Sequence, residues 1–141
     1  MPAFTMEIPV RFADTDPAGI VFYPRYFEMM NKVVEDWFAH GLGLPFRRMH
    51  LEEHVGVPAV SVEAVFENPS RLGDMLTFAL TVRRIGTKSA TIDIAATCDG
   101  EPRLNARQVI AYTTTRPAIN AVPIPGDLCD RMAAFVDDGE D

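Results

Sequence analysis

The N-terminal segment 6–12 alternates between hydrophobic and polar residues, which is typical of a half-buried β-strand. Pro9 lies within this segment and has no backbone N–H, so we expect an edge position or a strand start. Similar alternation returns after residue 58 in four segments that turn residues separate, and Asp99-Gly100 predicts a tight hairpin between the last two. The residues that share one face are Met6, Ile8, Val10 and Phe12 in the first strand; Val60, Val62, Ala64 and Phe66; Leu76, Phe78, Leu80 and Val82; Ala90, Ile92, Ile94, Ala96 and Cys98; and Leu104, Ala106, Ile110 and Tyr112 in a strand over 103–115.

Residues 25–40 repeat their hydrophobic side chains every three to four positions, which predicts a long amphipathic helix. Pro24 suits its first turn, where a missing N–H costs little, and Gly41 is expected to follow its end as the C′ residue. Shorter helices are predicted over 45–54 and 127–136. The apolar stripe of the long helix contains Tyr26, Phe27, Met30, Val33, Val34, Trp37 and Phe38, and that of the last helix contains Leu128, Met132 and Phe135.

The order of these elements predicts an α+β fold in which an antiparallel sheet covers one long helix. A length of 141 residues is typical of one domain, so we expect a single domain over 1–141. The acidic tail 136–141 is expected to be frayed. The sheet has long edges, and pairing with a second copy of the chain is one way to protect them.

Composition and charge exclude several function classes. The net charge of −7 and the pI of about 4.9 disfavour nucleic acid as a partner, because the chain repels a phosphate backbone. Two cysteines, Cys98 and Cys129, do not form a disulfide framework, and reduced thiols are the simpler interpretation. The N-terminus lacks the pattern of a signal peptide, and no apolar run is long enough to span a membrane. We therefore expect a cytoplasmic protein with no membrane partner.

A loop of unusual composition joins the first strand to the long helix: Asp14-Thr15-Asp16-Pro17-Ala18-Gly19-Ile20-Val21-Phe22-Tyr23-Pro24. Taken alone, Asp, Pro and Gly at these positions also fit a simple turn with a helix cap. The loop resembles that of the 4-hydroxybenzoyl-CoA thioesterases. That resemblance implies a hot-dog fold, with a curved antiparallel sheet of about five strands wrapped around the helix. Segment 58–66 is similar to that family's second strand, and Lys88-Ser89 to a pair that contacts CoA; the resemblance extends to about Thr115.

The resemblance implies that Asp16 is the catalytic carboxylate of an acyl-CoA thioesterase that acts on an aromatic or small acyl group. A free aspartate is ionised at neutral pH, and a following helix N-terminus favours the anion. Asp16 can attack the thioester carbonyl or activate a water molecule. By resemblance, the backbone N–H of Tyr23 stabilises charge on the carbonyl oxygen. Asp14 is expected to accept a hydrogen bond that stabilises the loop, and the chemistry needs no metal or redox cofactor.

Recognition of CoA differs from the family pattern. Lys88 and Ser89 are the expected contacts, although a lone lysine is also common as a solvated surface charge. Two arginines precede this pair in the family, whereas Gly86 and Thr87 stand here and the nearest arginines are Arg83 and Arg84. Further candidates for the CoA phosphates are Arg71 and Arg107. The departure leaves the substrate less constrained than the reaction.

Two alternatives compete with a thioesterase. His50-Leu51-Glu52-Glu53-His54 fits a zinc-peptidase pattern, but a third ligand is needed, and we interpret the segment as a solvated helix face. A non-catalytic acyl-CoA-binding module is the second alternative, and Asp16 in the loop argues against it. Hot-dog dehydratases use a catalytic histidine, and the loop contains none. The resemblance also implies a homo-oligomer, a dimer or dimer of dimers, with the site at a subunit interface.

Overall fold

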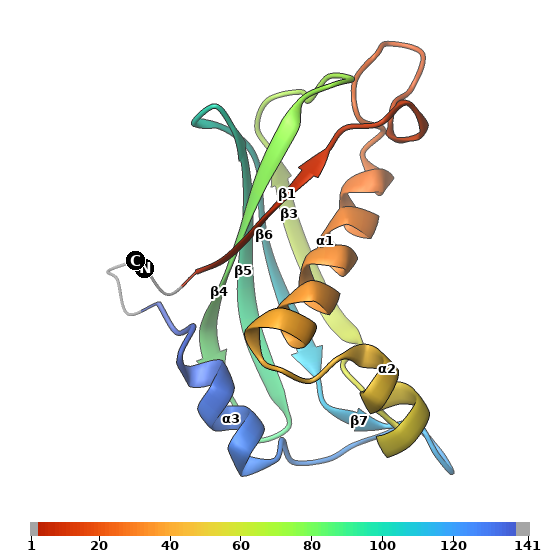
Figure 1. Ribbon diagram of the computed structural model, residues 1–141, viewed down its shortest axis with the longest axis vertical. Helices are drawn as coiled ribbons and strands as arrows, with labels where there is room; N and C mark the ends of the chain where they lie inside the picture. Colours follow the sequence, from red (N-terminus) through yellow and green to blue (C-terminus); the bar gives the residue numbers. More distant parts are fainter. Residues whose placement is uncertain (1–2, 138–141) are drawn as a thin grey trace.

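A five-stranded antiparallel sheet curves around helix α1 (Pro24–Asp36) in the computed structural model, which describes residues 3–137 (Figure 1). The order of strands across the sheet is β1-β4-β5-β6-β3. Their bounds are β1 (Phe4–Pro9), β3 (Ala59–Phe66), β4 (Met75–Ile85), β5 (Ser89–Cys98) and β6 (Glu101–Ala111). The α+β layout predicted from the sequence, a curved sheet around one long helix, is confirmed. No helix in the described part of the chain is long and apolar enough to cross a membrane.

The hydrophobic core lies between the inner face of the sheet and α1. Alternation predicted the inner faces of β4 and β5 correctly, since all their expected apolar side chains are buried. The helical stripe is also largely confirmed, and Met29 joins it with 1% exposure. Helix α1 continues into a π-helical turn over Trp37–Gly41. The buried helical residues are Tyr26, Met29, Met30, Val33, Val34, Trp37 and Phe38.

Smaller elements surround the far end of α1. Helix α2 (Phe46–Arg48) leads into a π-helical turn over Met49–Glu53, close to the short helix expected there. Strands β2 (Val55–Gly56), β7 (Thr113–Thr114) and β8 (Asn120–Ala121) form a second, three-stranded sheet. The strand predicted over 103–115 is therefore wrong at its end, because β6 stops at Ala111 and the chain then pairs with β2 and β8.

Two local predictions near the ends of α1 are also wrong. Phe12 is 81% exposed and belongs to a 3-10 turn over Phe12–Asp14, because Asp14 Oδ2 accepts the Arg11 N–H (2.8 Å) and turns the chain out of the sheet. Gly41 lies inside the π-helical turn, and it is Gly43 that has a left-handed φ of +71°. Gly41 is required by packing instead, since an added Cβ would lie 2.7 Å from Trp37 Cδ1.

The predicted hairpin is confirmed, whereas the predicted C-terminal helix and frayed tail are corrected. Asp99 and Gly100 have φ values of +51° and +83°, as a tight hairpin requires. Helix α3 (Gly126–Ala133) ends before residue 136. Val136 then bridges to Val82, and the Asp137 N–H donates to Val82 O (3.1 Å), so this part of the expected frayed tail is held against β4. The rest of that tail, 138–141, lies outside the described residues.

Strand β3 forms one edge of the large sheet and pairs only with β6 among the described strands. Its expected inner residues Val60, Val62 and Phe66 are 63%, 41% and 44% exposed, so the predicted burial of this face is wrong for a single chain. The reason is position, because β3 is an edge strand of the sheet that residues 3–137 form. An open edge with apolar side chains is a surface that another strand can cover.

Candidate active site

The loop between β1 and α1 folds into a tight turn around Asp16. Asp16 Oδ1 accepts the Ala18 N–H (2.8 Å), and the Asp16 carbonyl accepts the Gly19 N–H (2.9 Å). Gly19 has a φ of +80°, a conformation that favours glycine. Asp16 is half-buried, and its second carboxylate oxygen has no hydrogen-bond partner within residues 3–137. The turn therefore fixes the side chain by one oxygen and leaves the other available.

Backbone hydrogen bonds hold this loop on both sides. The Phe22 N–H donates to Asp14 O (2.9 Å), and Asp14 Oδ2 holds Arg11, so the expected loop-stabilising role of Asp14 is confirmed. On the other side, the Val21 N–H donates to Ser70 O (2.8 Å), in the segment that joins β3 to β4. Asp16 and Tyr23 thus lie in one loop that is anchored to itself and to a neighbouring segment.

Tyr23 occupies the position immediately before α1, with helical φ and ψ of −53° and −33°. Its backbone N–H has no acceptor in the part of the chain that the structure describes. Helix N-termini leave such donors unpaired, and the helix dipole makes them favourable for negative charge. The loop therefore combines a carboxylate oxygen and an unpaired N–H, the two groups that the sequence predicted.

An aromatic pocket lies beside the loop. Its volume is about 480 Å³, and its walls come from Ile20 to Tyr26 on one side and from Phe66 to Ser70 on the other. The Phe66 ring stacks on Tyr26 at a centroid distance of 5.5 Å and meets Tyr23 edge-on at 6.0 Å. Phe66 was not expected here, because it is distant in the sequence.

A buried polar network lies behind the pocket wall that Tyr26 and Ser70 form, and the sequence did not predict it. The Tyr26 hydroxyl donates to Ser70 Oγ (2.9 Å), and Arg103 Nη1 also donates to Ser70 Oγ (3.2 Å). Arg103 is 9% exposed and donates to Asp74 Oδ2 (2.7 Å) and Pro69 O (3.2 Å). The hydrogen bond from Arg103, together with one from the Arg71 N–H, holds the pKa of Asp74 below its usual value. The one feature of the sequence that could have indicated this network is the position of Arg103, directly before the apolar Leu104 in a predicted strand.

The structure does not bring Lys88 and Ser89 to Asp16 within one chain. They lie at the turn between β4 and β5 near α3, whereas the Asp16 loop lies at the opposite end of the sheet (Figure 1). The ten residues of β5 span about 33 Å at roughly 3.3 Å per residue. The Lys88 side chain has no ion-pair partner among residues 3–137. Arg84 lies close by, since its Nη2 is 3.9 Å from where a Cβ on Gly86 would be.

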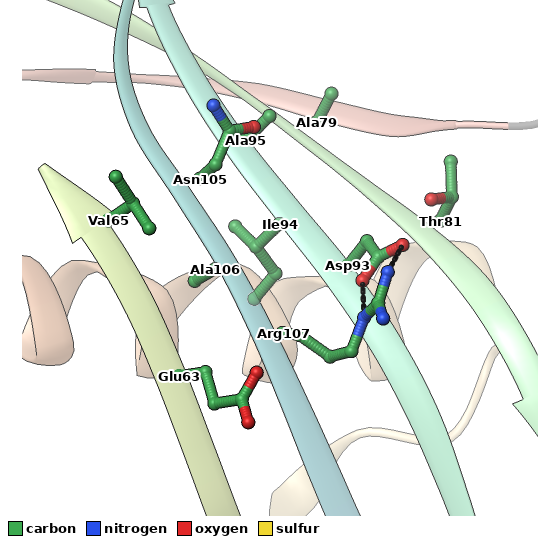
Figure 2. A pocket seen from close by; sticks show the side chains of 10 residues that line it. All are labelled: Glu63, Val65, Ala79, Thr81, Asp93, Ile94, Ala95, Asn105, Ala106 and Arg107. Carbon is green, nitrogen blue, oxygen red and sulfur yellow. Dashed lines mark hydrogen bonds and ion pairs between the residues drawn. The ribbon is translucent and has the colours of Figure 1, made fainter. Parts of the chain in front are cut away.

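A second depression, of about 370 Å³, lies on the outer face of the sheet (Figure 2). Arg107 spans part of it and donates to both oxygens of Asp93, at 2.7 and 3.3 Å. Helix α1 lies behind the sheet in this view, and no residue of the Asp16 loop lines the depression. Within one chain, Arg107 is therefore engaged with Asp93 on the face away from the helix.

The residues of the zinc-peptidase pattern have other contacts. Glu53 pairs with Arg48 (2.8 Å), His50 Nδ1 contacts Phe46 O (3.0 Å), and His54 has a left-handed φ of +56°. Within the described ranges, no three His, Cys, Asp or Glu side chains gather in a way that holds a metal ion.

Comparison with known proteins agrees with this architecture. Residues 10–132 match the Thioesterase-like superfamily. The 4-hydroxybenzoyl-CoA thioesterase of Pseudomonas sp. (strain CBS-3) is 34% identical over 89 residues, which are 62% of this chain and 62% of that enzyme. The match thus spans less than two thirds of that enzyme. The 1,4-dihydroxy-2-naphthoyl-CoA hydrolase of Thermosynechococcus vestitus is 28% identical over 119 residues, 84% of this chain and 81% of that one.

The fold comparison gives the same result. The solved structure of the 4-hydroxybenzoyl-CoA thioesterase from Pseudomonas sp. strain CBS-3 superimposes with a TM-score of 0.81 at 25% identity, covering 92% of this chain and 98% of that one. The resemblance drawn from the loop is confirmed at the level of family and fold. The chain therefore belongs to the Thioesterase-like superfamily and has the hot-dog fold of its thioester hydrolases.

Proposed function

We propose that this thioester hydrolase cleaves an aromatic acyl-CoA to the free acid and CoA, with Asp16 as its catalytic carboxylate. The observation that carries the proposal is the loop geometry. One Asp16 oxygen is fixed by the Ala18 N–H, the other has no partner among the described residues, and an unpaired N–H stands at Tyr23. The two relatives named above are an enzyme of 4-hydroxybenzoyl-CoA and one of 1,4-dihydroxy-2-naphthoyl-CoA, both hydroxylated aromatic thioesters.

The chemistry follows from these two groups. The free Asp16 oxygen attacks the thioester carbonyl, or it takes a proton from a water molecule that attacks. The carbonyl oxygen becomes negative and is stabilised by the Tyr23 N–H. The C–S bond then breaks and the CoA thiolate leaves. In the nucleophilic route, water next hydrolyses the mixed anhydride and restores Asp16. Both routes consume one water and need no metal or redox cofactor.

A single chain does not complete this site. Lys88 and Ser89, the proposed CoA contacts, lie at the end of the sheet away from Asp16. We place them in the site of another copy, with Arg84 beside Lys88 as a second cation for the CoA phosphates. The open edge of β3 supports this assembly, because antiparallel pairing of two β3 strands covers exposed Val60 and Val62. The working enzyme is then a homodimer or a dimer of dimers.

The cellular setting and the partners follow from chemistry. Cys98 and Cys129 are free thiols, which fits the reducing cytoplasm. The net charge of −7 repels a nucleic-acid backbone, so acyl-CoA is the proposed partner besides a second copy.

Thiol release from a panel of acyl-CoAs tests the proposal. The panel contains benzoyl-, 4-hydroxybenzoyl-, 1,4-dihydroxy-2-naphthoyl- and short aliphatic acyl-CoAs. Asp16→Asn keeps an oxygen for the Ala18 N–H, and we expect it to lose activity by about 10²- to 10⁴-fold at unchanged Tm. Asp16→Ala loses the turn contact as well. Tight binding without turnover across the panel favours the acyl-CoA-binding module, and full activity in both variants refutes the role of Asp16.

A further inference from the structure

Another cavity, of about 480 Å³, lies between α1 and the start of β3. It is distinct from the aromatic pocket beside the Asp16 loop. Its walls are mixed. Val34 from α1, Phe46 from α2 and Ile110 from β6 are apolar, and Asn31 and Glu35 of α1 add polar groups at its exposed side. Its volume is enough for a substituted aromatic ring, and neither the fold nor the loop chemistry explains why one of its amide side chains is buried.

That amide is Gln108, which lies on the inner face of β6. It is 4% exposed, in register with buried Leu104, Ala106 and Ile110. Its one hydrogen bond runs from Nε2 to Met30 Sδ (3.7 Å), and a thioether is a weak acceptor. The Gln108 oxygen has no partner among the described residues.

The unpaired end of this amide opens into the cavity. Across residues 3–137, Trp37 Nε1 is the one fully enclosed side-chain nitrogen or oxygen that lacks a partner. The Gln108 oxygen is therefore not fully enclosed, and the space beside it is the cavity that Gln108 lines. A buried amide is normally satisfied by hydrogen bonds, so this group is placed to receive a polar ligand atom.

The two cavities lie at opposite ends of β3. The aromatic pocket contains Phe66, at the end of the strand, and the Gln108 cavity contains Ala59, at its start. In antiparallel pairing about a two-fold axis near the middle of β3, the start of one strand lies beside the end of the other. The Gln108 cavity of one protomer then adjoins the aromatic pocket and Asp16 loop of its partner.

We infer that Gln108 of one protomer hydrogen-bonds a hydroxyl group on the aromatic ring whose thioester is held by the partner's Asp16 loop. This inference rests on the proposed thioesterase function and on the pairing of β3. A hydroxyl both donates and accepts, so it satisfies an amide that a plain hydrocarbon ring leaves unpaired. Gln108 thus selects hydroxylated aromatic acyl groups over unsubstituted ones.

The first test measures selectivity, the ratio of kcat/KM for 4-hydroxybenzoyl-CoA to that for benzoyl-CoA. Gln108→Leu is expected to lower this ratio about tenfold, because only 4-hydroxybenzoyl-CoA loses a buried hydrogen bond in the variant. Ile110→Val, in the same cavity, removes only a methyl group and is the matched control whose ratio stays within about twofold of wild type. A Gln108→Leu ratio within that same range overturns the inference.

Stability separates a binding role from a structural one. A structural glutamine is destabilising to replace, whereas this amide lacks good partners in the free protein. We therefore expect Gln108→Leu to have an equal or higher Tm than wild type without ligand. A clear fall in Tm together with an unchanged selectivity ratio assigns Gln108 to folding and refutes the inference.

Co-expression of two inactive or unselective chains tests whether the groups act across the interface. Chains with Asp16→Asn and chains with Gln108→Leu form hybrids in which one site has both native groups. Roughly a quarter of all sites then recover hydroxyl selectivity if pairing is random. In a control mixture of wild type with the double variant Asp16→Asn, Gln108→Leu, action in trans leaves the active site of each hybrid without Gln108, so about half of all active sites are unselective. If both groups instead came from one chain, every active site of this control would stay selective. Failure of the first mixture to recover any hydroxyl selectivity refutes action in trans.

A binding measurement tests the role of Gln108 independently of turnover. Thioether analogues, in which a methylene group separates carbonyl and sulfur, cannot be hydrolysed. Calorimetry is expected to show about tenfold tighter binding of the 4-hydroxyphenyl analogue than of the phenyl analogue, lost in Gln108→Leu. If wild type binds with this preference but releases no thiol from any acyl-CoA, the proposed hydrolysis fails, whereas recognition of the ring hydroxyl by Gln108 is supported. Equal binding of both analogues refutes the inference even in an active enzyme.

Discussion

Replacement of Arg103 by leucine is expected to loosen the Asp16 loop through a residue that never touches substrate. Arg103 donates to Asp74, Ser70 and Pro69, and the same segment accepts the Val21 N–H of the loop. Loss of one partner from a fully buried ion pair costs about 3–5 kcal/mol. The Asp74 side chain is 27% exposed, so water recovers part of this energy, and we expect a loss of about 2–3 kcal/mol. For this chain length, that corresponds to a fall in Tm of about 6–9 °C.

The pH dependence of this loss has a definite sign. The hydrogen bond from Arg103 lowers the pKa of Asp74 in the folded state, so the pair stabilises the protein while Asp74 is ionised. This contribution is complete above the unfolded pKa, about 4 for an aspartate, and it is lost as pH falls through the folded pKa. The difference in stability between wild type and Arg103→Leu should therefore be full at neutral pH and shrink in acid.

Urea denaturation of both proteins at neutral pH and at about pH 2.5, at equal protomer concentration, measures this difference. Arg107→Leu is the matched control. Arg107 also donates to an aspartate, Asp93, at the same 2.7 Å, but on the exposed outer face, where ion pairs contribute little. Equal losses in the two variants, or an Arg103→Leu loss that persists unchanged in acid, refute the reasoning.

Three other predictions concern assembly, packing and CoA. Val62→Lys puts a charge on the open edge of β3 and is expected to give a monomer by analytical ultracentrifugation with little thioesterase activity; a variant that stays dimeric excludes β3 as the interface. Gly41→Ala places a Cβ 2.7 Å from Trp37 Cδ1 and should cost about 1–3 kcal/mol by thermal denaturation, whereas Gly126→Ala, with nothing within 4 Å of its Cβ, should cost far less. Lys88→Ala and Arg84→Ala are expected to raise KM for acyl-CoA several-fold at low salt and much less at roughly 1 M salt; a KM unaffected at low salt removes this turn from the CoA site.

The inner strands of the sheet were predictable because each has the core on one side and solvent on the other. In such strands, every second residue is apolar and faces the core, as it does from Leu76 to Val82. Val60 and Val62 have the same alternation, yet they are exposed in one chain. Alternation identifies which residues share a face, and it contains no information on whether a second molecule covers that face. The prediction for Phe12 was wrong for a local reason. The Asp14 side chain accepts the Arg11 N–H and ends the strand, although the alternation continues to Phe12.

The candidate site was predictable where its residues are neighbours in the chain. Asp16 and Tyr23 belong to one loop, so the resemblance of that loop to a known family was enough to propose both as candidates. Phe66 contacts Tyr23, and Arg103 binds Ser70 in the segment that anchors the loop; both come from distant strands, and only the register of the sheet places them there. Gln108 gave a visible signal as a polar residue in register with Leu104 and Ile110, but its meaning depends on the cavity beside it.

The open edge of β3 has a consequence for how the protein accumulates in a cell. A newly folded protomer exposes Val60, Val62 and Val65 on β3, which pairs on one side only among the described strands. Such an edge pairs with other exposed strands as readily as with its proper counterpart, and that is a route to aggregation. Correct association is second order in protomer concentration, so partially synthesised or destabilised chains compete for the same edge. The yield of native protein then depends on how quickly one copy finds another.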